Sequence, residues 1–288
     1  MHDSSVSTCG RRRDNLSANF PMGDASTLHN GLTVAYDEVG TGKPFVLLHG
    51  FPHNRSLWAP QTSALIEHGR CIAPDLRGFG ESGREGPYSM EQYATDVVGL
   101  LENLGIERAV VGGLSMGGYV AFALWRLRPD LVRALVLADT RPGADSPDTR
   151  RKRLETMALA REGGAGAVAN AQIMGMVGAT TRAQNPALVD GLHQMLASAP
   201  VEGIIGALQA MMDRPDSTEL LPTIDVPTLI IVGEEDALTP VKESRAMHAA
   251  ILGSRLEVIR GAGHCSNFEK PAAFNHVLGE FLSALNYA

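Results

Sequence analysis

A serine flanked by glycines is the first residue in this sequence whose setting suggests chemistry. The segment Gly113-Leu114-Ser115-Met116-Gly117 fits the pattern G-x-S-x-G, follows an apolar run at 109–111 and opens a helical pattern. In a sharp strand-to-helix turn the serine backbone is strained, and small neighbours prevent collisions with the adjoining strand and helix. The turn would lift the hydroxyl above the sheet edge, facing the free N–H groups of a helix N-terminus. Ser115 is therefore the candidate nucleophile.

Two other glycine-rich motifs do not fit this segment. A P-loop requires Lys after its second glycine, but Tyr119 follows Gly118. The dinucleotide pattern G-x-G-x-x-G is also missing from 112–117. Neither a nucleotide nor a dinucleotide site is predicted here.

A serine hydroxyl needs a base, and histidine suits that role near neutral pH. Among nine histidines, His264 is best placed, because it follows the last apolar run in Gly261-Ala262-Gly263-His264. His49 also ends an apolar run, but the glycine after it suggests a different role for that turn. We predict that His264 is the general base.

The base needs an acid that fixes its tautomer and stabilises the imidazolium. Asp236 follows the apolar run at 228–232, which gives the chain order serine, aspartate, histidine. Glu234, Glu235 and Asp139 remain alternatives, since each also follows an apolar run. Asp236 is the preferred acid.

Acyl transfer also requires N–H donors for the oxyanion. The amide of Met116, directly after the serine, is one candidate. The amide of Phe51 is the other, because Gly50 allows the unusual backbone angle that would point it into the site.

Short apolar runs and helical patterns alternate along most of the chain. The runs do not alternate with polar residues, so both of their faces should be buried, as in a parallel sheet covered by helices. Asn30-Gly31 before 32–39 indicates a hairpin. The strands are expected at 45–48, 71–73, 109–111, 134–138, 228–232 and 256–259. The clearest helices are expected at 89–104, with a Ser89/Gln92 capping box, at 116–127 and at 271–285. Repeated strand–helix–strand order predicts an α/β fold, with a mostly parallel twisted sheet and helices on both faces.

One insertion divides this pattern. Residues 141–221 have helical patterns without a convincing strand, which predicts a helical cap between two parts of a core domain, 25–140 and 222–288. Residues 1–24 are polar and aperiodic and are interpreted as a disordered leader, with Met22 as a second candidate start. The cap holds six of the 11 methionines and no Phe, Tyr or Trp, so it could form an adaptable apolar wall.

Composition excludes several classes of function. The 25 Lys and Arg against 32 Asp and Glu give a net charge of −7, which argues against nucleic acid as a partner. The basic run Arg150 to Arg153 is interpreted as a solvated face. Three cysteines cannot form a disulfide framework, and no apolar run is long enough to span a membrane. A cytoplasmic location is expected.

Five motifs together resemble the cap-bearing α/β-hydrolases. They are His49-Gly50-Phe51-Pro52, Pro74-Asp75-Leu76-Arg77-Gly78-Phe79-Gly80-Glu81-Ser82, Gly113-Leu114-Ser115-Met116-Gly117-Gly118, Gly233-Glu234-Glu235-Asp236 and Gly263-His264. The likeness extends from about Thr27 to the end, and the elbow and the helix after Tyr88 are similar to those of 3-oxoadipate enol-lactonases and small carboxylesterases. Epoxide hydrolases and haloalkane dehalogenases of this fold use Asp at the elbow, so Ser115 favours an acyl-serine intermediate.

The resemblance and the residues together predict a serine hydrolase acting on a small carboxylic ester or lactone. No metal and no organic cofactor is expected, and a homodimer is left open. Alternatives are C–C bond hydrolysis or cofactor-free perhydrolysis of the haloperoxidase type on the same residues, or a ligand-binding receptor with little turnover. Arg77 and Arg141 are candidates for binding a substrate carboxylate, although structural roles are favoured. The residues expected to contact substrate are Gly50, Trp58, Met174 and Met211.

Overall fold

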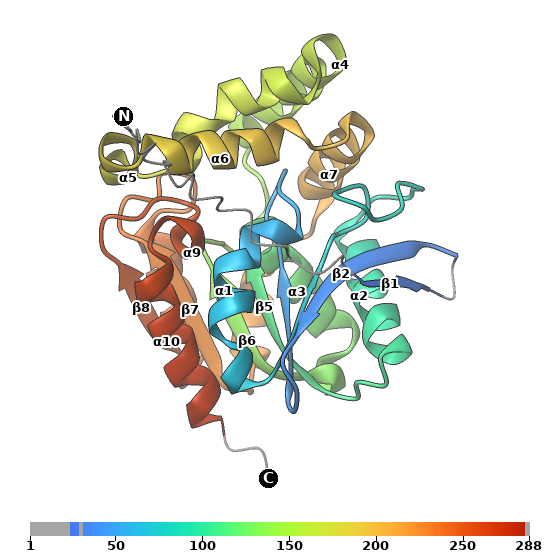
Figure 1. Ribbon diagram of the computed structural model, residues 1–288, viewed down its shortest axis with the longest axis vertical. Coiled ribbons are helices and arrows are strands. Elements are labelled where there is room, and N and C mark those ends of the chain that lie inside the picture. Colours follow the sequence, from blue (N-terminus) through green and yellow to red (C-terminus); the bar gives the residue numbers. More distant parts are fainter. Residues whose placement is uncertain (1–23, 29–30, 286–288) are drawn as a thin grey trace, which may run out of the picture.

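A twisted sheet of eight strands lies at the centre of the described chain (Figure 1). The computed structural model describes residues 24–28 and 31–285. The strand order across the sheet is β1-β2-β4-β3-β5-β6-β7-β8. The strands are β1 (Asp24–Thr27), β2 (Thr33–Val39), β3 (Pro44–Leu48), β4 (Arg70–Pro74), β5 (Ala109–Leu114), β6 (Val132–Ala138), β7 (Thr228–Gly233) and β8 (Arg255–Ile259).

The sheet is parallel from β4 to β8 and antiparallel only at the β1–β2–β4 end. This arrangement confirms the predicted fold class. Of the predicted hairpin turn, Asn30 lies outside the described residues, while Gly31 has φ +84°, a conformation that glycine adopts without strain.

Helices cover both faces of the sheet, because each strand sends alternate side chains into one of two apolar cores. In β3, Val46 and Leu48 enter the core that includes α2 and α3, while Phe45 and Leu47 enter the core that includes α10. The helices outside the insertion are α1 (Ala59–Ala64), α2 (Met90–Asn103), α3 (Met116–Leu127), α8 (Val241–Ala250), α9 (Ser266–Glu269) and α10 (Pro271–Ala284). Short 3-10 turns lie at Arg55–Trp58, Ile66–His68, Pro129–Leu131 and Thr218–Thr223.

Two local predictions need correction. Ser89 accepts a hydrogen bond from the Gln92 amide, but the Gln92 side chain donates to Asp96 instead of completing a capping box. The last strand, β8, is not buried on both faces as expected: Ile259 is buried, whereas Arg255 and Val258 are exposed. An edge strand has a neighbour on one side only, so its faces are less fully covered.

The insertion between β6 and β7 contains α4 (Pro147–Met176), α5 (Ala179–Gln184), α6 (Pro186–Ala197) and α7 (Val201–Asp213). These helices lie together across one end of the sheet (Figure 1). Gly164 interrupts α4 with φ +70°, so the two parts of this 30-residue helix run in different directions. The carboxyl ends of the parallel strands face this layer, which encloses the space above them.

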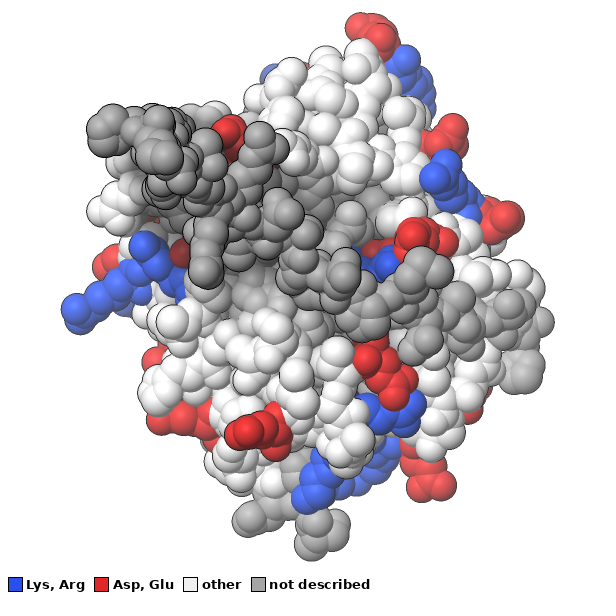
Figure 2. Space-filling view, in the orientation of Figure 1, with Lys and Arg blue, Asp and Glu red and all other residues white. Residues whose placement is uncertain are grey.

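The charge of the surface and the lengths of the helices indicate whether nucleic acid or a membrane is a suitable partner. On the face shown in Figure 2, acidic and basic side chains are interspersed, without a broad field of lysine and arginine among the described residues. Within 24–28 and 31–285 no single helix has the length and apolar character to cross a membrane; by those two criteria α6 and α7 together would pass, with a 91° bend between them.

Candidate active site

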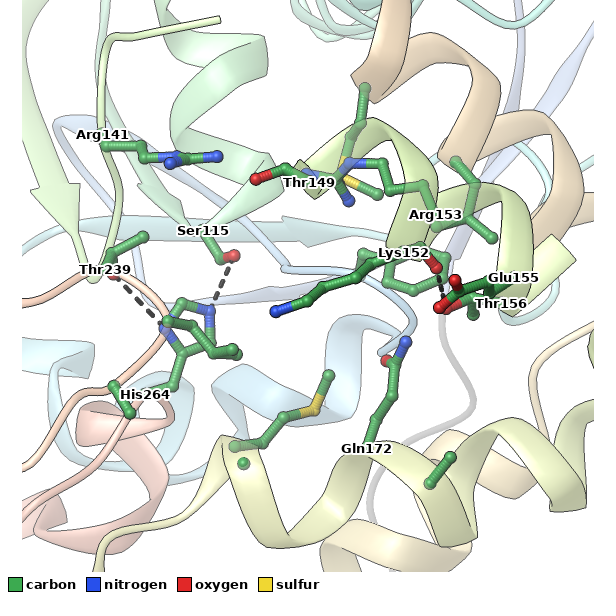
Figure 3. Close-up of a pocket in the computed structure, with 18 of the residues that line it drawn as sticks. Ser115, Arg141, Thr149, Lys152, Arg153, Glu155, Thr156, Gln172, Thr239 and His264 are labelled. Atoms are coloured by element: carbon green, nitrogen blue, oxygen red, sulfur yellow. Dashed lines mark hydrogen bonds between the residues drawn. The ribbon is translucent and has the colours of Figure 1, made fainter. Parts of the chain in front are cut away.

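Ser115, His264 and Asp236 form one hydrogen-bonded line at the carboxyl end of the sheet. His264 Nε2 lies 2.8 Å from Ser115 Oγ, and His264 Nδ1 lies 2.8 Å from Asp236 Oδ2 (Figure 3). The three residues follow β5, β7 and β8. These strands are parallel, β7 and β8 are neighbours, and only β6 lies between β5 and β7, so their carboxyl ends meet at one edge of the sheet. The structure therefore brings together residues that are 149 and 28 positions apart in the chain.

The turn after β5 has the strained geometry that the sequence predicts. Ser115 has φ +55°, and α3 begins at the next residue. A Cβ on Gly113 would lie 2.2 Å from the Gly117 carbonyl, and one on Gly117 would lie 2.1 Å from the Leu48 oxygen. Only glycine fits at these two positions, so the turn brings the serine hydroxyl to the edge of the sheet.

Asp236 is held by four hydrogen bonds. Its Oδ1 accepts from the amides of Leu238 and Thr239, and its Oδ2 accepts from the Thr239 hydroxyl and from His264. Burial alone would raise its pKa, but the nearby imidazole and these hydrogen bonds outweigh burial and lower the pKa to about 2. Asp236 is thus ionised at neutral pH.

His264 is the partner that Asp236 orients. Burial opposes its protonation, but the charge of Asp236 and the hydrogen bond to it prevail, so the pKa of His264 is raised above 6.5. With Nδ1–H directed at Asp236, Nε2 is left as the acceptor for the serine proton.

The other candidate acids have different partners. Glu234 accepts from the Gly261 amide, and Glu235 accepts from the amide and hydroxyl of Thr180. Asp139 is fully buried, has φ +45°, and accepts from the Gly233 amide and the Ser266 hydroxyl. Geometry therefore selects Asp236 among the alternatives.

Asp139 instead joins the end of β6 to the end of β7 and to α9, which follows His264. Burial and the nearby Asp236 raise its pKa well above the usual range for aspartate.

We expect Asp139→Ala to lower the free energy of unfolding by about 1–3 kcal/mol, because the buried Gly233 N–H loses its acceptor. Asp139→Asn keeps an acceptor for that N–H and has the shape of the neutral acid, so it should lower the free energy of unfolding clearly less. Urea unfolding measures both; equal losses would contradict the hydrogen-bonding role.

The two predicted oxyanion donors lie beside the serine. Met116 is the first residue of α3, and Phe51 is in the turn after β3; both are buried. Neither amide N–H donates to an acceptor within the described parts of the chain. A Cβ on Gly50 would lie 3.3 Å from Ser115 Cβ, so this turn passes directly against the serine.

Two side chains position the site through contacts that the sequence analysis did not predict. His49, kept neutral by burial that lowers its pKa, contacts the Gly50 carbonyl through Nδ1 and accepts from the Leu76 amide through Nε2. Glu269 accepts from the amides of Gly178, Gly263 and Cys265, which ties the insertion to the loop that carries His264. The sequence features that could have indicated these roles are the position of His49 directly after a strand and the position of Glu269 five residues after the candidate base.

Neighbouring groups show no second reactive centre. Cys265 is fully buried, and burial raises its thiol pKa well above the usual range, so the thiol is protonated. Burial also lowers the pKa of the adjacent His53 to about 3, which keeps that ring neutral. Within the described residues, no group of three or more His, Cys, Asp or Glu is arranged to hold a metal ion.

A cavity of about 620 Å³ opens onto Ser115 and His264 (Figure 3). Phe51 and Met211 line it, as expected for Met211. Trp58 and Met174 do not: Trp58 is fully buried against Phe274, and Met174 is 54% exposed on the insertion. Gly50 lies close to Leu114 and Ser115 and does not line the cavity.

The basic run at 150–153 largely fits the expected solvated face. Arg150, Arg151 and Lys152 are exposed, whereas the side chain of Arg153 is only 15% exposed. Lys152 and Arg153 also line the cavity. Arg141 lines it too, whereas Arg77 is buried in an ion pair with Asp96 at the β4 side of the core. The cavity wall therefore combines apolar side chains, Met176 and Met211 of the insertion among them, with three cationic residues.

Comparison with known proteins identifies a family model and relatives that match most of this chain. The family model described as alpha/beta hydrolase fold matches residues 43–271. A 3-oxoadipate enol-lactonase from Acinetobacter baylyi is 30% identical over 234 residues, which cover 81% of this chain and 86% of the relative.

Solved structures give similar matches. A thermophilic esterase from Thermogutta terrifontis, solved with malate bound, has a TM-score of 0.87 and 40% identity, covering 91% of this chain and 98% of that one. A bromoperoxidase from Bacillus anthracis has a TM-score of 0.81 and 27% identity, covering 91% and 99%.

Proposed function

Because this chain belongs to the α/β-hydrolase fold family, we propose that it is a serine hydrolase that cleaves carboxylic esters or lactones through an acyl-serine intermediate. The observation that carries the proposal is the pair of 2.8 Å contacts that join Ser115 to His264 and His264 to Asp236. The esterase and enol-lactonase among its relatives support the choice of ester or lactone.

In the first half of the reaction, Ser115 Oγ attacks the carbonyl carbon while His264 Nε2 takes its proton. The carbonyl oxygen becomes an oxyanion, which the amides of Phe51 and Met116 can receive, each donor contributing about 2.7–4 kcal/mol in comparable sites. The imidazolium, stabilised by Asp236, then donates its proton to the leaving alkoxide. An acyl-serine remains.

In the second half, water replaces the alcohol. His264 Nε2 takes a proton from the water as it attacks the acyl carbon, and the same oxyanion donors are used again. The proton returns from His264 to Ser115 Oγ as the acid leaves. His264 carries each proton transfer in this route.

Turnover and labelling together test the proposal. Ester and lactone substrates should be compared by kcat/KM, since specificity is a ratio of those values. An organophosphate should add one phosphoryl group to the protein, and peptide mass spectrometry should find it on Ser115. Absence of both turnover and labelling in the folded protein would refute the proposal.

The pH dependence of kcat/KM provides a separate prediction. Ser115 can be activated only while His264 is neutral, and the pKa of His264 is raised above 6.5. Activity on a non-ionising ester should therefore rise with pH and reach half of its plateau above pH 6.5, in a profile measured from about pH 5 to about pH 9. Asp236, with a pKa of about 2, adds no further inflection in this range. A midpoint below 6.5 would contradict the raised pKa.

A second candidate is cofactor-free perhydrolysis, favoured by the likeness to a bromoperoxidase. There, hydrogen peroxide replaces water in the second half and the acyl-serine is released as a peracid. Peroxide-dependent bromination that is faster than ester hydrolysis would favour this candidate.

A further inference from the structure

A buried group of arginines lies beside the cavity. The side chain of Asp145 has no exposed surface, and it contacts Arg141 at 3.2 Å, Arg214 at 2.7 Å and Arg153. We call these four residues the Asp145 cluster. Three guanidinium groups share this one carboxylate, and buried cations normally require close compensation. The cluster is therefore short of negative charge.

Nearby acids supply only part of the missing charge. Asp216 interacts with Arg214 and Glu243 with Arg141 through space, and Glu155 lies on the cavity wall, but none of these acids makes an ion pair with the cluster among the described residues. Figure 3 shows Glu155 beside Thr156, at the end of the cavity away from Ser115. Arg141 and Lys152 are the charged side chains drawn at the end nearer the serine.

Two cations extend into that end. Arg141 lines the cavity, and its Nε is buried without a hydrogen-bond partner. Lys152, on α4, has no ion pair or hydrogen bond from its ammonium group within the described residues, and it points across the cavity toward Ser115 and His264 (Figure 3). Arg141 approaches the same space from the segment after β6. Both offer unused donors near the position of a scissile carbonyl.

We propose that Arg141 and Lys152 form a subsite for a carboxylate group of the substrate. Guanidinium and ammonium groups bind carboxylates by charge-assisted hydrogen bonds, which are strongest where water is excluded. The preferred substrate is then an ester or lactone that carries a free carboxylate in addition to the bond that is cleaved, such as the monoester of a short dicarboxylic acid. This inference rests on the proposed function and specifies its substrate class.

Matched esters test the subsite. Monomethyl glutarate carries a carboxylate, and methyl hexanoate is a neutral ester of similar length; titration of released acid measures both. The wild type should prefer the charged ester by at least about tenfold in kcat/KM. Lys152→Met should remove most of this preference, chiefly by lowering kcat/KM for the charged ester, and Arg141→Gln should act in the same direction. Added salt should also reduce the preference.

Arg151→Met is the matched control. Arg151 is on the same helix, pairs with Asp148 and has a side chain that is 64% exposed, so its removal should leave both rates unchanged. An equal loss in Lys152→Met and Arg151→Met would attribute the effect to general charge, and would overturn the subsite.

Calorimetric binding of glutarate separates this inference from the proposed function. If neither ester is hydrolysed but glutarate binds the wild type and not Lys152→Met, the carboxylate subsite stands and the hydrolase proposal fails. If both esters are hydrolysed without preference for charge, the hydrolase proposal stands and the subsite is wrong. Absence of both glutarate binding and charge preference overturns the subsite in either case.

Discussion

Ser115→Ala should lower kcat by roughly 10⁶-fold, the loss seen when a serine nucleophile is removed from a comparable site. The substitution removes the oxygen that lies 2.8 Å from His264 Nε2 and leaves the Phe51 and Met116 amides in place. The residue's backbone bonds remain, since its amide donates to Ala138 and its carbonyl accepts from Thr140. Steady-state kinetics on a p-nitrophenyl ester measures the loss, and organophosphate labelling should disappear with it.

Ser63→Ala is the control for this experiment. Ser63 is exposed at the end of α1, and its hydroxyl bonds only to the Ala59 carbonyl among the described residues. Its removal should change neither rate nor labelling. Undiminished ester turnover in Ser115→Ala would show that another group is the nucleophile and would remove the basis of the acyl-serine proposal.

The fold could be predicted from the sequence because its signals are local. Continuous apolar runs such as that of β7 are typical of strands covered on both faces, and all six residues of β7 are indeed buried. The start of α2 follows from the capping hydroxyl of Ser89. The exposure of β8 could not be predicted in the same way, because position at a sheet edge depends on the order of all the strands.

The placement of the three candidate catalytic residues followed from topology. Residues directly after parallel strands gather at one edge, which brings Ser115 near His264. The choice between Asp139 and Asp236 needed atomic detail, because both follow neighbouring strands. The Leu238 and Thr239 amides orient the Asp236 carboxylate toward His264, whereas the Gly233 amide and Ser266 hold Asp139.

The cavity wall was predicted least well. Helical periodicity shows which face of a helix is apolar, but it does not show which neighbour that face meets. Met174 and Met211 both fit an apolar wall, yet one is exposed and the other lines the cavity. Lys152 is exposed, as expected for a basic run, but its charge did not show that it also lines the cavity. The break at Gly164 sets the course of α4, and no pattern in the sequence specified its angle.

Asp236→Asn should reduce kcat/KM by about 10⁴-fold, as the equivalent change does in a well-studied serine protease. In the wild type the amides of Leu238 and Thr239 donate hydrogen bonds to Asp236 Oδ1. In the variant we expect the amide oxygen of the new side chain to accept these two hydrogen bonds. The amide nitrogen would then face His264 Nδ1 and donate to it, so the proton of the neutral imidazole would move to Nε2. In that tautomer Nε2 cannot take the proton of Ser115, and the pKa of His264 should also fall because the charge that raises it is gone.

Glu235→Gln is the matched control, because Glu235 is the neighbouring acid and bonds to Thr180, not to His264. Its kcat/KM should stay within about threefold of the wild type, since surface acids away from the reacting atoms contribute little. Thermal unfolding of both variants separates loss of fold from loss of chemistry. An equal loss of activity in the two variants would contradict the assignment of Asp236. So would an acid limb in Asp236→Asn that has not moved to lower pH.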